Sequence, residues 1–116
     1  MKLCLAVMLA SLSAVAVSPA IAGTQTGFVK DIYVRDSDGL ILVDLMGTAS
    51  GHPVCALQPY WIIPNETTDN GKRLLSMLVA AQSAGRVVQI IGKDTCTRWP
   101  DGEDIDVVGV TGTQAP

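Results

Sequence analysis

The chain has 116 residues, of which 48% are hydrophobic and 4% aromatic, and its formal net charge at pH 7 is −3. Acidic side chains outnumber basic ones by 11 to 8, which argues against a nucleic-acid partner because phosphate binding depends on clustered Lys and Arg. A chain of this length has room for one compact domain and not for two.

The first 22 residues have the pattern of a secretory signal peptide. Lys2 precedes an apolar run from Leu3 to Val17, and a small-x-small triplet occupies positions 20–22. The run is short for a bilayer crossing, so we expect no stable membrane anchor. We predict cleavage after Ala22 and a secreted or periplasmic protein with a single domain at 23–116.

Two cysteines, Cys55 and Cys96, lie outside this leader. An oxidising compartment favours a disulfide between them, which would leave neither thiol free as a nucleophile. In the chain-entropy model, closing a loop of this length contributes roughly 4 kcal/mol of stability. A zinc site is the alternative, but with only His52 nearby the cysteines fall short of four ligands, so we predict no metal and no cofactor.

Two strands joined by a hairpin turn are expected first. They span Phe28 to Arg35 and Leu40 to Met46, and Asp-Ser-Asp-Gly at 36–39 forms the turn, where Asp accepts local hydrogen bonds and Gly allows positive φ. Apart from Asp44, both faces of the second strand are apolar. This strand is therefore expected to be central in a curved or closed sheet.

A third extended segment follows a polar loop. It covers "VCALQPYWIIP", residues 54–64, with an interruption at Pro59, and Cys55 is expected near its start. Tyr60 and Trp61 in this segment either line a ligand surface or subunit contact, or wedge the following helix onto the sheet. We favour the wedge.

One helix is expected within residues 65–85. Thr68, Asp69 and Asn70 offer N-caps, and Gly85 closes the helix. Its apolar stripe consists of Leu74, Leu75, Leu78 and Ala81. The stripe is narrow and suits a helix that covers one end or face of a small sheet.

Two more strands complete the chain, "RVVQIIG" at 86–92 and "DIDVVGVTG" at 104–112. The resulting order, β-β-β-α-β-β, is that of the OB-fold, a five-stranded barrel whose binding loops join strands one to two and four to five. Those loops would be 36–39 and 93–103. Any five-stranded α+β sheet also fits this order, but the fold class we predict is mainly β with one helix, an OB-fold-like barrel.

The stretch "GKRLLSMLVAAQSAGRVVQIIG" followed by "TCT" resembles small secreted bacterial OB-fold proteins, with a Leu-Leu-x-x-Leu-x-x-Ala helix, a Gly, a β-run and a Cys-centred loop. The pattern is similar to the B subunit of subtilase cytotoxin and, more distantly, to pertussis-type toxin B subunits. The resemblance covers roughly Phe28 to Val110. It implies a homo-pentamer that binds cell-surface glycans and carries a catalytic A subunit, and no sugar-contacting residue is carried over from it.

The candidate binding residues lie in "CTRWPDGED". Trp99 would offer a flat face to a sugar ring, Arg98 a charge-assisted donor, and Asp101 or Glu103 acceptors for hydroxyls. The alternative is structural. Trp99 would then pack on the disulfide, residues 100–102 would form a turn, and the acids would keep an edge strand soluble.

Other chemistry has weaker support. "DSDGLILVD", residues 36–44, begins like a calcium loop but lacks its later ligands and its final Glu. Asp104 and Asp106 share one face of a strand, which is expected to face solvent. His52 has no Ser or carboxylate beside it, so we expect no catalytic residues and no enzyme.

Two functions follow from these observations. The first is a secreted binding module resembling toxin B subunits, which recognises a glycan or a protein surface. The second is a stand-alone periplasmic interaction or envelope-stress protein without sugar specificity.

Overall fold

The computed structural model describes residues 13–14 and 21–114. The predicted leader therefore lies almost entirely outside the described residues. The elements within them are β1 (Thr24–Val34), β2 (Ile41–Leu45), β3 (Trp61–Ile62), α1 (Asp69–Ala84), β4 (Arg86–Gly92) and β5 (Glu103–Gln114). Their order is the predicted β-β-β-α-β-β, so the fold class is confirmed.

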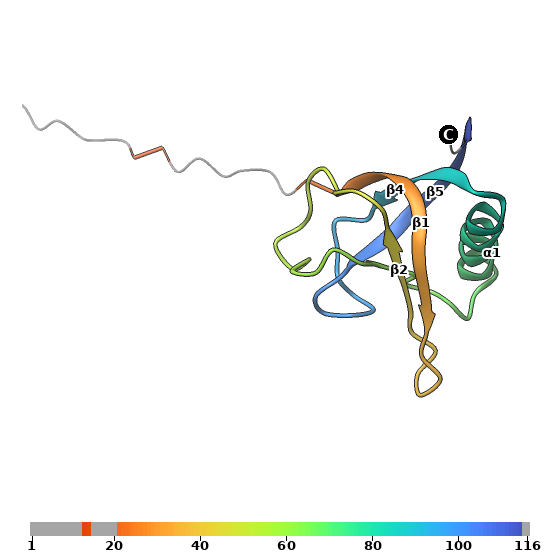
Figure 1. Cartoon of the computed structure of the whole chain (residues 1–116). Coiled ribbons are helices and arrows are strands. Elements are labelled where there is room, and N and C mark those ends of the chain that lie inside the picture. Colours follow the sequence, from red (N-terminus) through yellow and green to blue (C-terminus); the bar gives the residue numbers. More distant parts are fainter. Residues whose placement is uncertain (1–12, 15–20, 115–116) are drawn as a thin grey trace, which may run out of the picture.

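The strands close into a barrel in the order β1-β2-β3-β5-β4 (Figure 1). β3 and β5 pair in parallel, and the other pairs are antiparallel. Closure gives every strand two neighbours, each paired along part of its length, which is how small barrels limit edge-to-edge association. The protein is thus an OB-fold-like barrel with one helix.

β1 is longer than the sequence predicts because it serves two neighbours. Its first part, from Thr24 to Phe28, pairs with β4, and its second part, from Val29 to Val34, pairs with β2. At Gly27 a Cβ atom would lie 2.3 Å from the carbonyl oxygen of Met46. A side chain at this position would push β1 away from the end of β2, so the glycine permits the bend of the strand.

The third strand is much shorter than expected and contains only Trp61 and Ile62. The expectation that Cys55 begins a strand is wrong, because the chain forms local turns there: Ala56 N–H donates to the Pro53 carbonyl at 3.1 Å. Prolines in this segment also remove donors that a strand ladder needs. Residues 46–60 form a long loop, called here the 46–60 loop.

The helix matches the prediction closely. Thr68 is its N-cap and accepts a hydrogen bond from Gly71 N–H at 3.1 Å, while Gly85 ends it with φ of 61°. Leu78 and Ala81 are buried, and Leu74 and Leu75 are partly buried against the core. Among the described residues, no helix has the length and apolar character that a membrane crossing requires.

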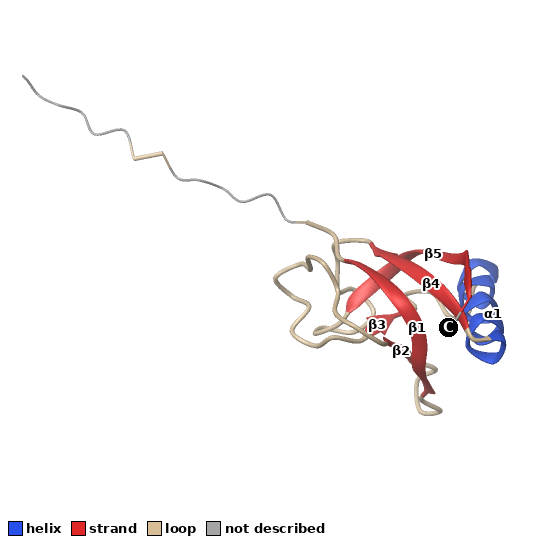
Figure 2. Ribbon diagram, turned by 45° about the horizontal axis from the view of Figure 1, so that its top comes forward, coloured by secondary structure: helices blue, strands red, loops and turns tan. Residues whose placement is uncertain are grey.

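Figure 2 shows α1 at one side of the barrel and the long loops at the opposite side. Between them lies a core of residues from every strand and from α1: Val29, Ile41, Val43, Leu45, Trp61, Ile63, Leu78, Ala81, Val88, Ile90, Ile105 and Val108. Burial of this apolar surface is the main force that closes the barrel. The polar features discussed next lie among the loops.

Candidate functional site

A disulfide joins the two longest loops. Cys55 in the 46–60 loop is bonded to Cys96 in the loop that connects β4 to β5, residues 93–102, and their Cα atoms are 6.1 Å apart. The backbone of Gln58 also donates to the carbonyl of Asp101 at 3.0 Å. The predicted disulfide is confirmed, and together with this hydrogen bond it holds the two loops in one arrangement.

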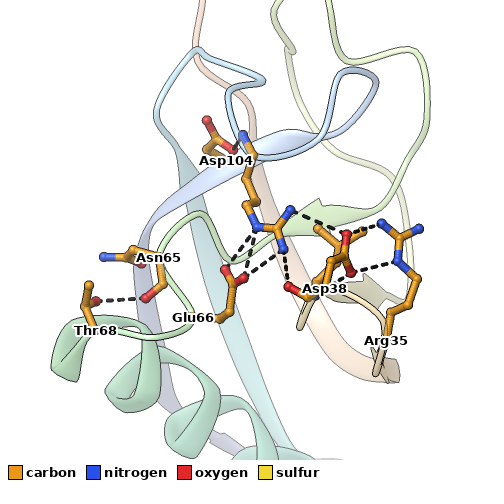
Figure 3. Close-up of polar contacts among 8 residues, drawn as sticks. Arg35, Asp38, Asn65, Glu66, Thr68 and Asp104 are labelled. Carbon is orange, nitrogen blue, oxygen red and sulfur yellow. Dashed lines mark hydrogen bonds and ion pairs between the residues drawn. The ribbon is translucent and has the colours of Figure 1, made fainter.

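Arg98, a candidate binding residue, is paired within the protein. Its Nε and Nη2 donate to the Glu66 carboxylate at 3.0 and 2.8 Å, and Nη2 also donates to the Asp38 carbonyl at 2.9 Å. Figure 3 shows Glu66 and Asp38 converging on this position. The hydrogen bond from Arg98 lowers the pKa of Glu66 although burial opposes it, so the ion pair persists at neutral pH.

Trp99 is half-buried, and the Arg35 guanidinium lies 4.4 Å from the centroid of its ring. Asp38 accepts hydrogen bonds from the same guanidinium, including one from Nε at 2.9 Å, and its pKa is far below the usual range for that reason. The turn between β1 and β2 and the 93–102 loop, which the OB-fold prediction names as binding loops, therefore meet. The arginine lies over the indole ring, and cation–π attraction holds it there.

Asp101, another candidate, accepts a hydrogen bond from the Tyr60 hydroxyl. The pKa of Tyr60 is raised, first by burial and then by this bond, whereas a hydrogen bond with Trp99 lowers it. The charge of Asp44 nearby also raises it. Tyr60 is thus hydrogen-bonded to the 93–102 loop.

Asp104 was expected on the solvent face, and that expectation is wrong. The side chain is fully buried and accepts hydrogen bonds from Thr95 Oγ1 at 2.8 Å, Thr97 N–H at 2.8 Å and Thr97 Oγ1 at 2.6 Å. Burial alone would raise the pKa of Asp104, but these hydrogen bonds outweigh it and the pKa is lowered. Of Asp104 and Asp106, only Asp106 is exposed. The role proposed for the acids on an edge strand also fails for Glu103 and Asp104, which are buried and lie where β5 pairs with β3.

Glu103, the last candidate, is only 3% exposed. Its carboxylate accepts hydrogen bonds from Gly23 N–H at 3.0 and 3.1 Å and from Asp94 N–H at 3.1 Å. A Cβ atom on Gly92 would lie 1.7 Å from its Oε2, so the strand can pass this side chain only as glycine. Burial raises the pKa of Glu103 although the backbone donors oppose it.

A pocket of about 450 Å³ lies beside these residues, between β2, the 46–60 loop and the start of β3. Its volume is within the range of small-molecule sites. The polar and aromatic residues that line it are Gln25, Lys30, Asp44, Thr48, His52, Gln58, Tyr60, Trp61 and Glu103. The pocket therefore combines hydrogen-bond donors, acceptors and aromatic surface in one concave place.

The pocket is held by packing and hydrogen bonds. Trp61 is buried, and its indole N–H donates to Gln25 Oε1 at 2.8 Å. Lys30 is exposed and forms only a surface ion pair with Asp31 at 3.7 Å, and Asp44 is half-buried. A ligand can compete for the Lys30 ammonium, whereas the indole N–H is already hydrogen-bonded to Gln25.

His52 is exposed and its Nδ1 donates to the Pro53 carbonyl at 2.9 Å. Within residues 13–14 and 21–114, no three His, Cys, Asp or Glu side chains gather as metal ligands would.

Sequence reasoning found the 93–102 loop and missed the partners of its residues. Glu66 is 32 positions from Arg98, and the Asp38 carbonyl is 60 positions away. Residues this far apart in the sequence form no local spacing pattern from which their contact could be predicted. The pocket residues Lys30 and Asp44 were also missed, and the only signal in the sequence was the single acid in an otherwise apolar second strand.

Comparisons with known proteins add no relative: no family model matches the chain, and neither a curated protein nor a solved structure is significantly similar to it.

Proposed function

We propose that the protein is an extracytoplasmic binding module that holds a sugar residue of a glycan in the pocket between β2 and the 46–60 loop. The observation that carries this proposal is the composition of that pocket, in which Asp44, Lys30 and Gln58 line the same space as the half-buried Tyr60. Sugars present hydroxyl groups around an apolar ring face. A concave site with polar side chains beside an aromatic ring complements both features.

The charged groups have separate roles in this proposal. The Asp44 carboxylate accepts hydrogen bonds from sugar hydroxyls, and the Lys30 ammonium donates to them. Hydrogen bonds to ionised groups are stronger than neutral ones, so these two side chains would supply much of the specificity. The amide of Gln58 can do both and adds directional selection.

The four residues predicted from the sequence then divide into two groups. Arg98 and Glu103 have their charges engaged within the protein and would position the pocket wall. Trp99 and Asp101 are half-buried beside Tyr60 and remain candidates for contact with a longer glycan. The disulfide supports this arrangement because a rigid frame reduces the entropy lost on binding.

The test is a glycan array followed by titration calorimetry of the strongest binder with four variants. Asp44→Asn and Lys30→Gln should each weaken binding roughly tenfold or more, since each removes a charge-assisted hydrogen bond. Asp36→Asn and Lys72→Gln are matched controls on exposed residues far from the pocket lining, and they should bind as the wild type does. Binding to no glycan, or equal losses in the controls, would refute the proposal.

A protein partner is the second candidate, and the 46–60 loop provides its support. Val54 is 91% exposed and Leu57 is 78% exposed, and Leu57 also lines the pocket. Large exposed apolar side chains beside a cavity are typical of interaction surfaces. If the array is negative and Leu57→Ser abolishes capture of an envelope protein, the stand-alone interaction protein becomes the better description.

The resemblance to toxin B subunits adds two elements to the proposal, a homo-pentamer and a catalytic A subunit. Sedimentation equilibrium tests the first, because five chains differ clearly in mass from one. A gene for a secreted enzyme next to this one, and co-purification of its product, would support the second. A monomer without such a neighbour would leave the glycan-binding pocket as a property of the single domain.

A further inference from the structure

Glu103 is a buried carboxylate without a cationic partner. Among the described residues, no Lys, Arg or His nitrogen lies within ion-pair distance of its oxygens. Its hydrogen bonds come from backbone N–H groups only. A buried ionised group is expensive unless it is paired, so the site is electrostatically incomplete.

The backbone nitrogen of Gly23 lies at this carboxylate. It is 3.0 Å from Oε1 and 3.1 Å from Oε2 of Glu103. Both distances fit a nitrogen that is shared by the two carboxylate oxygens. Gly23 is also the residue that follows the predicted cleavage site, so its nitrogen would become a primary amine in the processed chain.

We propose that removal of residues 1–22 completes this site: the new α-ammonium group of Gly23 becomes the buried counter-ion of Glu103 and locks the start of β1 into the barrel. This inference rests on the export that is part of the proposed function. It assigns to Glu103 a role in addition to positioning the pocket wall. The processed chain would then be more stable than any chain in which this nitrogen is an amide.

The surroundings of Gly23 keep its nitrogen in place after cleavage. Its carbonyl accepts a hydrogen bond from Gly92 N–H at 2.9 Å, and the next residue, Thr24, exchanges two hydrogen bonds with Ser50 at 3.0 and 2.7 Å. A Cβ atom on Gly23 would lie 2.5 Å from Glu103 Oε1. Glycine is therefore the residue whose nitrogen can approach the carboxylate this closely.

The bond to be cleaved joins Ala22 to Gly23. Ile21 is 63% exposed and Ala22 is half-buried, whereas Gly23 is buried. Among the described residues, the side chain of Asp94 acts to raise the pKa of Glu103 and His52 acts to lower it, both less than burial and the backbone donors do. His52 lies on the exposed 46–60 loop, so it cannot replace a cation in direct contact with the carboxylate.

The experiment uses the full chain, exported by a bacterial host and purified from the periplasm. Intact mass should identify Gly23 as the first residue. A second full chain carries one Ser inserted between Ala22 and Gly23, so that cleavage leaves the ammonium one residue away and the Gly23 nitrogen an amide. Both chains are also made with Glu103→Gln, and urea unfolding is measured for all four.

In the wild-type background, the insertion should lower the folding equilibrium constant by roughly tenfold or more, as expected for a buried charge-assisted hydrogen bond. In the Glu103→Gln background, the effect of the insertion should largely disappear. Amine-directed acylation of the two Glu103 chains gives a readout that does not depend on folding of the Gln variant. The wild-type α-amine should react more slowly than the exposed α-amine of the Ser-inserted chain.

Three results would overturn the inference. They are a first residue other than Gly23, an insertion effect that is equal in both backgrounds, and an α-amine that acylates equally fast in both chains. The same preparations serve for the glycan array. A negative array with a protected Gly23 amine would count against the proposed function alone, whereas a positive array with a different first residue would count against this inference alone.

Discussion

Arg98 and Glu66 lie side chain to side chain, with Nη2 2.8 Å from Oε1, although one belongs to the 93–102 loop and the other to the segment that precedes α1. Both side chains are mostly buried from solvent, with 21% and 13% of their surfaces exposed. The ion pair connects the loop side of the barrel to the helix side. The ion pair therefore helps to hold the 93–102 loop against the segment that precedes α1.

Glu66→Gln should lower the free energy of unfolding by about 1 kcal/mol, because the pair is charge-assisted but partly exposed. Urea unfolding at low and high salt measures the change, which should shrink as salt screens the charges. A double-mutant cycle with Arg98→Gln should show coupling between the two positions. Additive losses would mean that the two side chains act independently.

Asp104→Asn should be one of the most destabilising single substitutions outside the core, lowering the free energy of unfolding by about 2–4 kcal/mol through weakened bonds to Thr95 and Thr97. The control is Asp106→Asn on the same strand, whose exposed side chain should tolerate the change. Chemical denaturation of both variants makes the comparison. Equal stabilities would contradict the role assigned to Asp104.

The same carboxylate predicts a dependence of stability on pH. Its pKa is lower in the folded chain than in the unfolded chain. The stability that Asp104 contributes is therefore fully present above the unfolded-state pKa of about 3.9 and is lost as the pH falls through the lower folded-state value. Urea unfolding across acidic pH should show a smaller acid-induced loss in Asp104→Asn than in the wild type.

Removal of the disulfide should destabilise the domain and disorder the pocket wall. Replacing Cys55 and Cys96 together by Ser should lower the free energy of unfolding by about 4 kcal/mol in the chain-entropy model. Alkylation mass spectrometry of the oxidised wild type should detect no free thiol at either position. Two alkylated thiols in that sample would show that the bridge does not form in solution.

The N-cap of α1 offers a prediction with a neighbouring control. Thr68→Ala removes the hydroxyl that accepts from Gly71 N–H and should lower the free energy of unfolding by about 1 kcal/mol. Thr67→Ala changes the adjacent exposed threonine and should have little effect. Thermal unfolding followed by circular dichroism compares them, and a larger loss for Thr67→Ala would assign the cap to the wrong residue.

Local signals predicted the fold well because each element carries its own. The cap at Thr68, the left-handed Gly85 and the apolar stripe between them define α1 without tertiary information. The predictions were wrong where tertiary contacts determine the burial of a residue. Gln25 lies in a polar stretch of the sequence, yet its side chain is buried and accepts a hydrogen bond from the Trp61 indole. The strand predicted from the sequence therefore began at Phe28, whereas β1 begins at Thr24.

The candidate site shows the same division. A loop that is rich in acids and contains a cysteine was recognisable as a fastened loop, and the disulfide confirmed that interpretation. The burial and the hydrogen-bond partners of each side chain could not be predicted from the sequence. Burial of Asp104, for example, depends on how the 93–102 loop folds back over β5. Lys30 and Asp44 share a pocket because β1 pairs with β2, with Asp31 opposite Asp44 and an irregularity in the register between Val29 and Asp31.

The most direct test of the proposed function is a map of where the strongest array glycan contacts the protein. Backbone amide shifts in a nitrogen-15 NMR titration provide it. We expect saturable shifts at Gly47, Thr48 and Gln58 around the pocket, and clearly smaller shifts for the same ligand in Asp44→Asn at equal concentration. Shifts confined to other parts of the barrel, or unchanged binding by Asp44→Asn, would contradict the account.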